Sequence, residues 1–294
     1  MREGKPSRTA LQVALHRAAH QLLDNPQVFT DPMALRILDA ESVRALRADP
    51  GHFERALTGS YLRAILAARS RIAEDALAES VVRGVTQYVI LGAGLDTFAY
   101  RNPFPSLRVF EVDHPATQAW KRELLQENTI GAPGNLAFVS VDFNRESFAD
   151  ELVNAGFDPG HGAMFSWLGV TPYVTRAIIA ATLTSVASLV GRTGGIVLDY
   201  VVPPETLPLH LQALMALRRA QLKAIGEPWV SFLSGGEMAG LLRAAGFQQI
   251  SDLGPDEINQ RYFSDRNDGL MVGSVGRVVN ASLTKNTAPA HHGR

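Results

Sequence analysis

The first part of the chain has apolar positions at helical spacing. TALQVALHRAAHQLL (9–23) and SYLRAILAARSRIAEDALAE (60–79) both repeat apolar side chains every three or four residues. The prolines in the intervening segment, 24–38, indicate a connector, and the dipeptide Asp31-Pro32 is typical of a helix start. Because no strand pattern occurs in this part, we expect residues 1–80 to form a helical cap.

From residue 81 onward, short apolar runs alternate with helical stretches. The expected strands are 87–91, 107–112, 136–141, 162–167 and 194–202. Helical periodicity between them is clearest over 115–127 and 175–190. This alternation predicts an α/β fold, in which a mostly parallel sheet has helices on both faces and occupies residues 81–280.

The later segments depart from that alternation. LPLHLQALMALRRAQLKAI (207–225) is a helical pattern with no strand behind it, which predicts a helical lid inserted at about 203–232. The helix-to-strand rhythm returns over 234–254, and 268–279 predicts a final strand or hairpin. The last residues, 281–294, are polar and without periodicity, so we expect a disordered tail.

A glycine turn, GAGLD, follows the first expected strand. Gly92 and Gly94 permit unusual torsions and a close approach of a ligand, although a GxG turn alone favours a purely structural role. The dinucleotide motif needs a third glycine where this chain has Thr97. Asp96 would repel a pyrophosphate but suits a cationic ligand. S-adenosylmethionine carries an ammonium and a sulfonium and no phosphate, so the turn favours a methyl-donor site over an NAD site.

Two acidic residues end the second expected strand. Glu111 and Asp113 lie roughly 20 residues beyond the glycines, where an acid binds ribose hydroxyls in related sheets. Alternation along a strand points both side chains to one face. Either acid alone is equally a solvated residue or a helix cap. At this spacing we assign at least one of them to the ribose.

Composition narrows the class of protein further. The chain has 294 residues, of which 46% are hydrophobic, and 28 basic against 29 acidic residues give a net charge of −1. That balance, without a basic patch or a polybasic helix, predicts neither a nucleic-acid nor a membrane partner. The absence of cysteine excludes disulfides and thiolate metal sites. With no signal-peptide pattern and no bilayer-length apolar run, we expect a cytoplasmic protein, and no metal site is predicted.

In combination, YVILGAGLDTFAYR and FEVDHP resemble the leucine carboxyl methyltransferase family. The similarity is greatest to its bacterial branch of S-adenosylmethionine-dependent O-methyltransferases, which includes polyketide and other natural-product enzymes. SRTALQVALHRA, FTDPMALRIL, AARSRIAEDAL, SVDFN, SWLGVTPYVT and LLRAAGF also fit, so the resemblance extends over residues 7–278. It implies a class I methyltransferase fold, with a Rossmann-like sheet of seven strands whose last strand is antiparallel and with an N-terminal helical cap.

The resemblance also implies which residues bind the methionine part of the donor. The glycine loop of the family matches Gly92, Ala93 and Gly94. Its arginine matches Arg69 in AARSR, which would pair with the donor carboxylate through a bidentate fork. An arginine on an amphipathic helix is otherwise a solvated residue, and Arg71 is the nearby alternative.

The nucleoside part would be bound by residues after the second and third strands. Asp113, with Glu111 beside it, matches the ribose-binding acid of the family. Asp142 would accept from the adenine amino group and Phe143 would cover the ring, although Asp142 is equally a cap without the resemblance. Eukaryotic members carry a glutamate after the fourth strand, and this chain has Trp167 and Leu168 in that neighbourhood. We place Trp167 at the donor site, and the departure favours the bacterial small-molecule branch.

The acceptor is less defined by the sequence. A carboxylate is ionised at neutral pH and needs no general base, whereas a phenol does. We expect His114 to cap the following helix and His161 to be an ordinary loop residue, so no catalytic base is assigned and a carboxylate or catalysis by proximity is favoured. Tyr173 and Arg176 are assigned to the acceptor, with a packing role as the alternative for Tyr173.

The sequence therefore predicts an S-adenosylmethionine-dependent O-methyltransferase. Its substrate would be a small-molecule carboxylate or phenol, and its setting would be secondary metabolism. Two alternatives stay open at this point: an NAD-dependent oxidoreductase, and a non-catalytic homologue that binds the donor without transferring its methyl group. The oligomeric state is not predicted.

Overall fold

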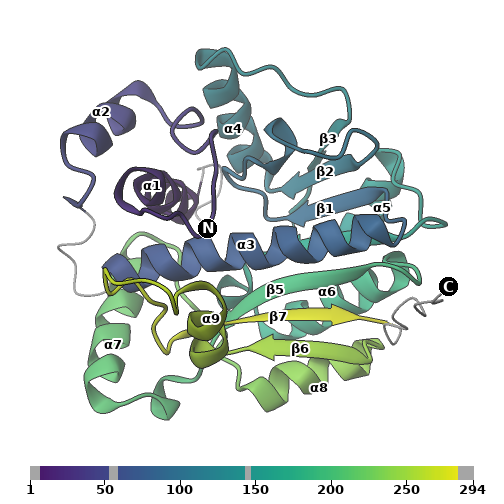
Figure 1. Cartoon of the computed structure of the whole chain (residues 1–294). Helices are drawn as coiled ribbons and strands as arrows, with labels where there is room; N and C mark the ends of the chain where they lie inside the picture. The colour runs from purple at the N-terminus through teal and green to yellow at the C-terminus, as the bar shows by residue number, and fades with distance from the viewer. Residues whose placement is uncertain (1–6, 53–58, 143–146, 284–294) are drawn as a thin grey trace, which may run out of the picture.

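The computed structural model describes residues 7–52, 59–142 and 147–283 (Figure 1). The strands are β1 (Gln87–Leu91), β2 (Arg108–Asp113), β3 (Leu136–Ser140), β4 (Ala163–Trp167), β5 (Gly195–Val201), β6 (Gln249–Leu253) and β7 (Gly276–Ser282). The α-helices are α1 (Arg8–Leu23), α2 (Ala40–Ala48), α3 (Gly59–Val82), α4 (Pro115–Glu127), α5 (Phe148–Asn154), α6 (Arg176–Leu189), α7 (Leu209–Ala224), α8 (Gly235–Ala245) and α9 (Pro255–Tyr262).

The strands form one 7-stranded sheet in the order β3-β2-β1-β4-β5-β7-β6. Neighbouring strands are parallel except where β7 pairs with β5 and with β6. The predicted α/β fold with a mostly parallel sheet is therefore confirmed. Every residue of β1 is buried, as expected for a central strand with helices on both faces. The strand order reverses between β1 and β4, which is where an open α/β sheet forms a ligand crevice.

The C-terminal strand differs in extent from the prediction. Strand pairing begins at Gly276 rather than at residue 268, so only the later part of the expected 268–279 segment is a strand. The strand continues to Ser282 because β5 and β6 hydrogen-bond to both of its edges. The expected tail boundary at residue 281 thus falls inside β7, and 284–294 lie outside the described residues.

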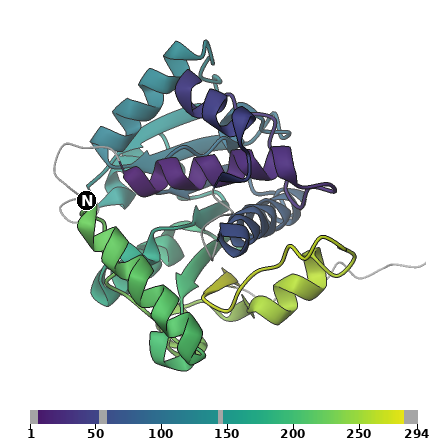
Figure 2. The same cartoon turned by 90° about the vertical axis from the view of Figure 1, so that its left-hand side faces the viewer.

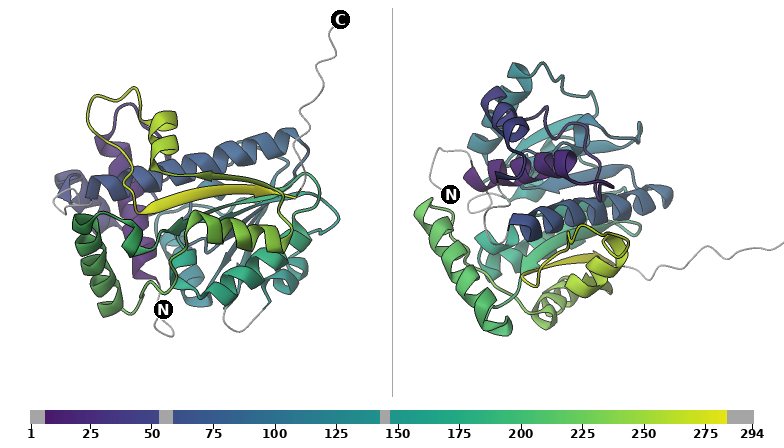
Figure 3. Two further views of the ribbon diagram at one scale, coloured as in Figure 1. Left: turned by 90° about the horizontal axis from the view of Figure 1, so that it is seen from below. Right: turned by 60° about the vertical axis from the view of Figure 1, so that its left-hand side comes forward.

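The two faces of the sheet carry separate helical layers (Figure 3). Residues of α5, α6 and α8 pack on one face, in a core that includes Phe165 and Trp167. Residues of α3 and α9 pack on the other face, against Tyr88 and Val109. α1, α2 and α4 share a third cluster that includes Leu95 of the glycine turn. No helix in these described segments has the length and apolar character needed to cross a membrane.

The segment between α1 and α2 does not contain the helix expected at Asp31. Residues 32–37 form consecutive turns, and helix begins only at α2. The Asp31 carboxylate accepts from the amide of Met33 at 2.9 Å, which closes one turn. It also forms buried ion pairs with Arg17 at 2.9 Å and with Arg101 at 3.2 Å. Asp31 therefore does not start a helix. Its ion pairs join α1 to the segment after the glycine turn.

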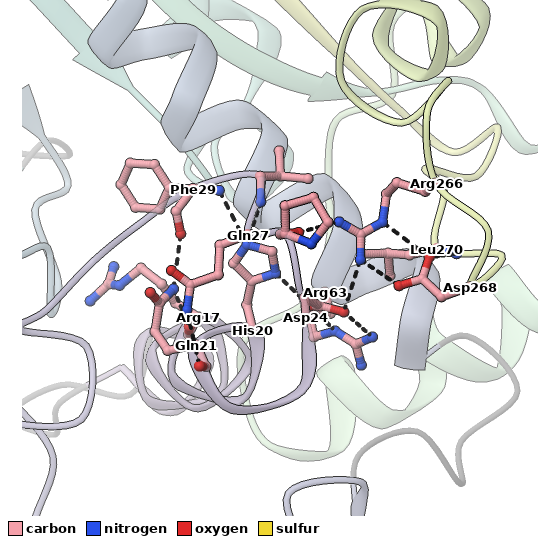
Figure 4. A network of polar contacts seen from close by, with 12 residues as sticks. Arg17, His20, Gln21, Asp24, Gln27, Phe29, Arg63, Arg266, Asp268 and Leu270 are labelled. Carbon is pink, nitrogen blue, oxygen red and sulfur yellow. Dashed lines mark hydrogen bonds and ion pairs between the residues drawn. The ribbon is translucent and has the colours of Figure 1, made fainter.

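A second buried network joins α1, α3 and the loop after α9 (Figure 4). Asp24 binds Arg63 with both carboxylate oxygens, at 2.8 and 3.0 Å, and lies 3.7 Å from Arg266. His20 Nε2 accepts from the backbone amides of residues 28–29, so its proton is on Nδ1 and is donated to Asp24. Burial alone would raise the pKa of Asp24, but the hydrogen bonds from His20 and Arg63 outweigh it and lower the pKa.

This network predicts a large stability effect at Asp24. Asp24→Ala leaves the Arg63 guanidinium buried without its carboxylate, and breaking such a pair costs about 3–5 kcal/mol. Chemical denaturation should show that loss in the free energy of unfolding. As a control, Glu79→Ala removes an exposed i,i+4 partner of Arg83 and should change stability by less than about 1 kcal/mol. Equal small effects of the two substitutions would mean that the network does not hold the cap in place.

Candidate functional site

A cavity of about 1080 Å³ lies at the carboxyl edge of the sheet. Residues at the ends of β1, β2, β4 and β5, and in the loops that follow them, form one side of it. α1 and α7 lie over the same edge, as the view onto that side of the molecule shows (Figure 2). Within the described segments no group of three or more His, Asp or Glu side chains is arranged to hold a metal ion.

The glycine turn after β1 leaves no room for side chains. Gly92 has φ +70°, and a Cβ there would lie 2.3 Å from a methyl carbon of Val170. Gly94 has φ +49°, and a Cβ there would lie 3.2 Å from the Cβ of Ala10 on α1. Both torsions are rare for residues with a side chain. The turn therefore exposes bare backbone to the cavity, together with the small Ala93, as predicted for a close ligand approach.

Asp113 and Glu111 differ in position, although both were candidates for the ribose. Asp113 is the last residue of β2 and lines the cavity, where it accepts from the amides of Gly94 and His114. Burial raises the pKa of Asp113 against the opposing effect of those two amides. Glu111 is 1% exposed, is not part of the cavity lining and pairs with Lys121 at 2.6 Å. The assignment of Glu111 to the donor is wrong, because it lies two positions deeper along the strand.

Arg69 reaches the cavity from α3. Its Nη1 donates to Asp199 Oδ2 at 2.6 Å, and the two side chains are 11% and 14% exposed. The other oxygen of Asp199 accepts from the amide of Gly169 at 2.6 Å. Gly169 has φ +73°, and a Cβ there would lie 2.9 Å from Arg69 Nη2. The alternative, Arg71, forms an exposed pair with Asp75 and does not line the cavity.

The remaining donor candidates divide into lining and core residues. Asp96 lines the cavity and accepts from the amide of Phe98 at 2.7 Å, and Asp142 also lines it. Phe143 lies outside the described residues. Trp167 is 0% exposed in the core under α5, α6 and α8, so its placement at the donor site is wrong. Strand alternation turns Trp167 to that face and leaves its two chain neighbours to line the cavity.

Of the two residues assigned to the acceptor, one lines the cavity and the other does not. Tyr173 lines the cavity, and burial raises the pKa of its hydroxyl. Arg176 is exposed at the start of α6 and pairs with Glu237 at 2.6 Å, so it does not contact the cavity. The first turn of α6 projects it toward α8 instead. His114 lines the cavity, and its Nδ1 caps α4 by accepting from an amide, as expected.

His161 lies away from this edge of the sheet. It is exposed in the loop before β4, where it pairs with Asp158 at 2.8 Å. That loop enters the sheet at the amino end of the strand, whereas the cavity lies at the carboxyl ends. His161 is therefore an ordinary loop residue, as expected.

Among the lining residues that the sequence did not identify, three make polar contacts that shape the cavity. Asp199 and Gly169 form the arginine contact described above, and Glu227 belongs to the cover of the cavity. Glu227 accepts from the amides of Arg8 and Thr9, at 2.7 and 3.0 Å, and so holds the first turn of α1 from beyond the end of α7. Asp199 could have been found from the sequence, because it is an acidic residue within the otherwise apolar run IVLDYVV.

This arrangement fits S-adenosylmethionine in charge and shape. The glycine turn is a cradle that a Cβ would fill, Asp113 is a carboxylate held at the end of β2, and Arg69 is a cation at the other side of the turn. Methyl transfer requires that water be kept from the reacting groups, and a covered cavity favours this. The chain's own groups can thus bind a nucleoside at one end and a charged amino-acid group at the other.

Comparison with known proteins agrees with this reading of the site. The family model for leucine carboxyl methyltransferase matches residues 10–187. A candidate S-adenosyl-L-methionine-dependent methyltransferase of Bacillus subtilis (strain 168), YktD, is 35% identical over 296 aligned residues, which cover 92% of this chain and 95% of that protein. A candidate methyltransferase of the same kind from Mycobacterium tuberculosis (strain ATCC 25618 / H37Rv), Rv3399, is 28% identical over 84% of this chain and 75% of that protein.

Solved structures support the fold. The crystal structure of a candidate methyltransferase from Thermobifida fusca YX superposes with a TM-score of 0.58 at 15% identity and covers 96% of each chain. These findings rule out the NAD-dependent oxidoreductase as an alternative, because the matched family and relative are methyltransferases. The chain belongs to the leucine carboxyl methyltransferase family and is an S-adenosylmethionine-dependent methyltransferase.

Proposed function

We propose that this methyltransferase transfers its methyl group to a carboxylate oxygen of a small, largely apolar molecule. The observation that carries the proposal is that a single cavity is lined both by the glycine turn and by residues of α7. We call the part of this cavity under α7 the second compartment. A phenol oxygen is the second candidate acceptor. The resemblance to bacterial natural-product enzymes supports a role in secondary metabolism, in the cytoplasm.

The walls of the second compartment are mainly apolar. They come from the start of α3, from α7, from the loop after it and from the segment before β7. The apolar and aromatic residues there are Tyr61, Leu62, Ile65, Leu211, Leu214, Met215, Trp229, Val230, Met271 and Val272. Such walls bind the hydrocarbon part of a ligand and leave orientation to a few polar groups.

Arg218 is a polar group well placed to orient an anionic acceptor. It lines the cavity from α7, and its Nη2 donates to the neutral side-chain amide of Gln12 at 3.0 Å. Burial, followed by the positive charges of Arg218 and Arg63, lowers the pKa of His16 to about 4. A carboxylate near Arg218 would gain from the charge and shape of its guanidinium, which favours a planar anion.

The sequence assigned no catalytic base, which favours a carboxylate. His114 uses its Nδ1 to cap α4, and His161 lies at the opposite edge of the sheet. His210 lines the cavity from α7 and is the candidate base if the acceptor is a phenol. Burial raises the pKa of Tyr173, which keeps this hydroxyl protonated at neutral pH. An acceptor carboxylate is already ionised, so the protein need only align its oxygen and exclude water.

On the donor side we propose roles for three lining residues. Asp113 accepts from the ribose hydroxyls, Asp142 accepts from the adenine amino group, and Arg69 pairs with the donor carboxylate. S-adenosylmethionine, when bound, supplies an electrophilic methyl group on its sulfonium. The chain's part is to hold both ends of the donor so that the sulfonium faces the compartment under α7.

The chemical nature of the product tests the acceptor class. The protein should be incubated with methyl-labelled S-adenosylmethionine and matched pairs of aryl or alkyl carboxylic acids and phenols. We expect labelled products from the carboxylic acids, and mild alkali should release the label as methanol because a methyl ester hydrolyses and an aryl ether does not. Alkali-stable label from the phenols would move the proposal to the second candidate. No transfer to any acceptor, despite donor binding, would support a non-catalytic homologue.

Asp113 should make a measurable contribution to donor affinity. Asp113→Ala removes a charged acceptor from the ribose, which typically costs about 1.5–3 kcal/mol. Calorimetry with S-adenosylhomocysteine should therefore show an affinity weaker by about one to two powers of ten. Asp158→Ala, a loop acid at the opposite edge, is the matched control and should leave affinity unchanged. Normal binding by a folded Asp113→Ala protein would remove Asp113 from the ribose site.

A further inference from the structure

The ion pair between Arg69 and Asp199 has an exposed side toward the ligand cavity. Arg69 comes from α3 and Asp199 from β5, and both line the cavity beside Gly92. Each side chain retains a small exposed fraction, 11% and 14%. A pair that is nearly buried loses much of its hydration, so a third charged partner bound from the cavity side would add favourable contacts.

The geometry of the pair is fixed by the segment after β4. The amide of Gly169 donates to Asp199 Oδ1 at 2.6 Å while Arg69 Nη1 donates to Oδ2 at 2.6 Å. The guanidinium lies so close to Gly169 that any Cβ there would be 2.9 Å from Nη2. The side-chain hydroxyl of Thr171 also donates to the Asp199 carbonyl at 2.6 Å. Asp199 is therefore presented in one orientation, with one hydrogen bond to each oxygen and lone pairs to spare.

Several other acidic residues that line the cavity make different contacts. Asp113 accepts from the amides at the end of β2, Asp96 accepts from the amide of Phe98, and Glu227 caps α1. Asp142 follows β3, which is separated in the sheet from β5 and its Asp199 by β2, β1 and β4. Asp199 is the lining carboxylate that contacts the arginine proposed to bind the donor carboxylate. An amino-acid group bound to Arg69 would bring its α-ammonium to the neighbouring acid.

We propose that Asp199 binds the α-ammonium of the donor, and that Asp199 and Arg69 together recognise its amino-acid zwitterion. The inference rests on the proposed role of Arg69 and extends it to a complete site of opposite charges. An ammonium has three donors and gains a charge-assisted bond to the carboxylate. Asp199 is thus a specificity residue that discriminates adenosine ligands with an intact amino-acid group from those without one.

Four adenosine thioethers separate the two charges. S-adenosylhomocysteine has the ammonium and the carboxylate, its decarboxylated analogue has only the ammonium, its desamino analogue has only the carboxylate, and 5′-methylthioadenosine has neither. Their affinities should be measured by calorimetry for the wild-type chain, Asp199→Asn and Arg69→Met. Asparagine still offers an oxygen to the Gly169 amide, and methionine keeps an apolar stem on α3.

Each variant should lose affinity for a different pair of ligands. Asp199→Asn should lower the affinity for S-adenosylhomocysteine and for the decarboxylated analogue by about 10- to 100-fold. The other two ligands should bind no more weakly to this variant than to the wild-type chain. Arg69→Met should instead lower the affinity for S-adenosylhomocysteine and for the desamino analogue. Asp75→Asn is the control: it alters another aspartate–arginine pair, with Arg71, and neither residue lines the cavity, so it should change none of the affinities.

Three results would overturn the inference. If Asp199→Asn weakens the desamino analogue, Asp199 merely orients Arg69. If it weakens the binding of all four ligands equally, or if Asp75→Asn produces the same pattern, the change reflects a disturbed fold. Wild-type binding of S-adenosylhomocysteine is the reference, so its absence would contradict the donor assignment itself. Methyl transfer to a carboxylate or a phenol plays no part in these measurements, and a failed acceptor proposal leaves them interpretable.

Discussion

The hydrogen bond from the Gly94 amide to the Asp113 carboxylate is the contact on which the donor site depends. It joins the turn after β1 to the end of β2, and so fixes the spacing between the bare backbone of the turn and the proposed ribose acid. The positive φ of Gly94 and the close approach of Ala10 make this arrangement intolerant of a side chain. Parallel strands bring both ends to one edge, so the fold itself assembles the site.

The cover over that edge comes from segments far apart in the chain. Glu227, which follows α7, holds the first turn of α1 through two backbone amides. Arg17, further along α1, donates to the carbonyl of Leu95 in the glycine turn at 2.5 Å. One helix therefore contacts both the segment after α7 and the glycine turn. This linkage holds α1 over the cavity, and such a cover would shield a methyl transfer from water.

The sequence predicts the parts of the site that depend on local pattern. The apolar run at 87–91 places β1 correctly, and the glycine pair and Asp113 follow from their position at strand ends. Depth along a strand is not visible in the same pattern, which is why Glu111 was assigned with Asp113 although it lies buried against Lys121. Asp199 was missed because its importance arises from α3 and β5 meeting across the sheet, a contact between positions 130 residues apart.

The crystal structure of the protein with S-adenosylhomocysteine is the most direct test of the account. It should show the ribose hydroxyls on Asp113, and the amino-acid group between Arg69 and Asp199, with the sulfur directed toward the compartment under α7. A homocysteine group that points into solvent, or a nucleoside bound away from the glycine turn, would contradict the assignment of this cavity to the methyl donor.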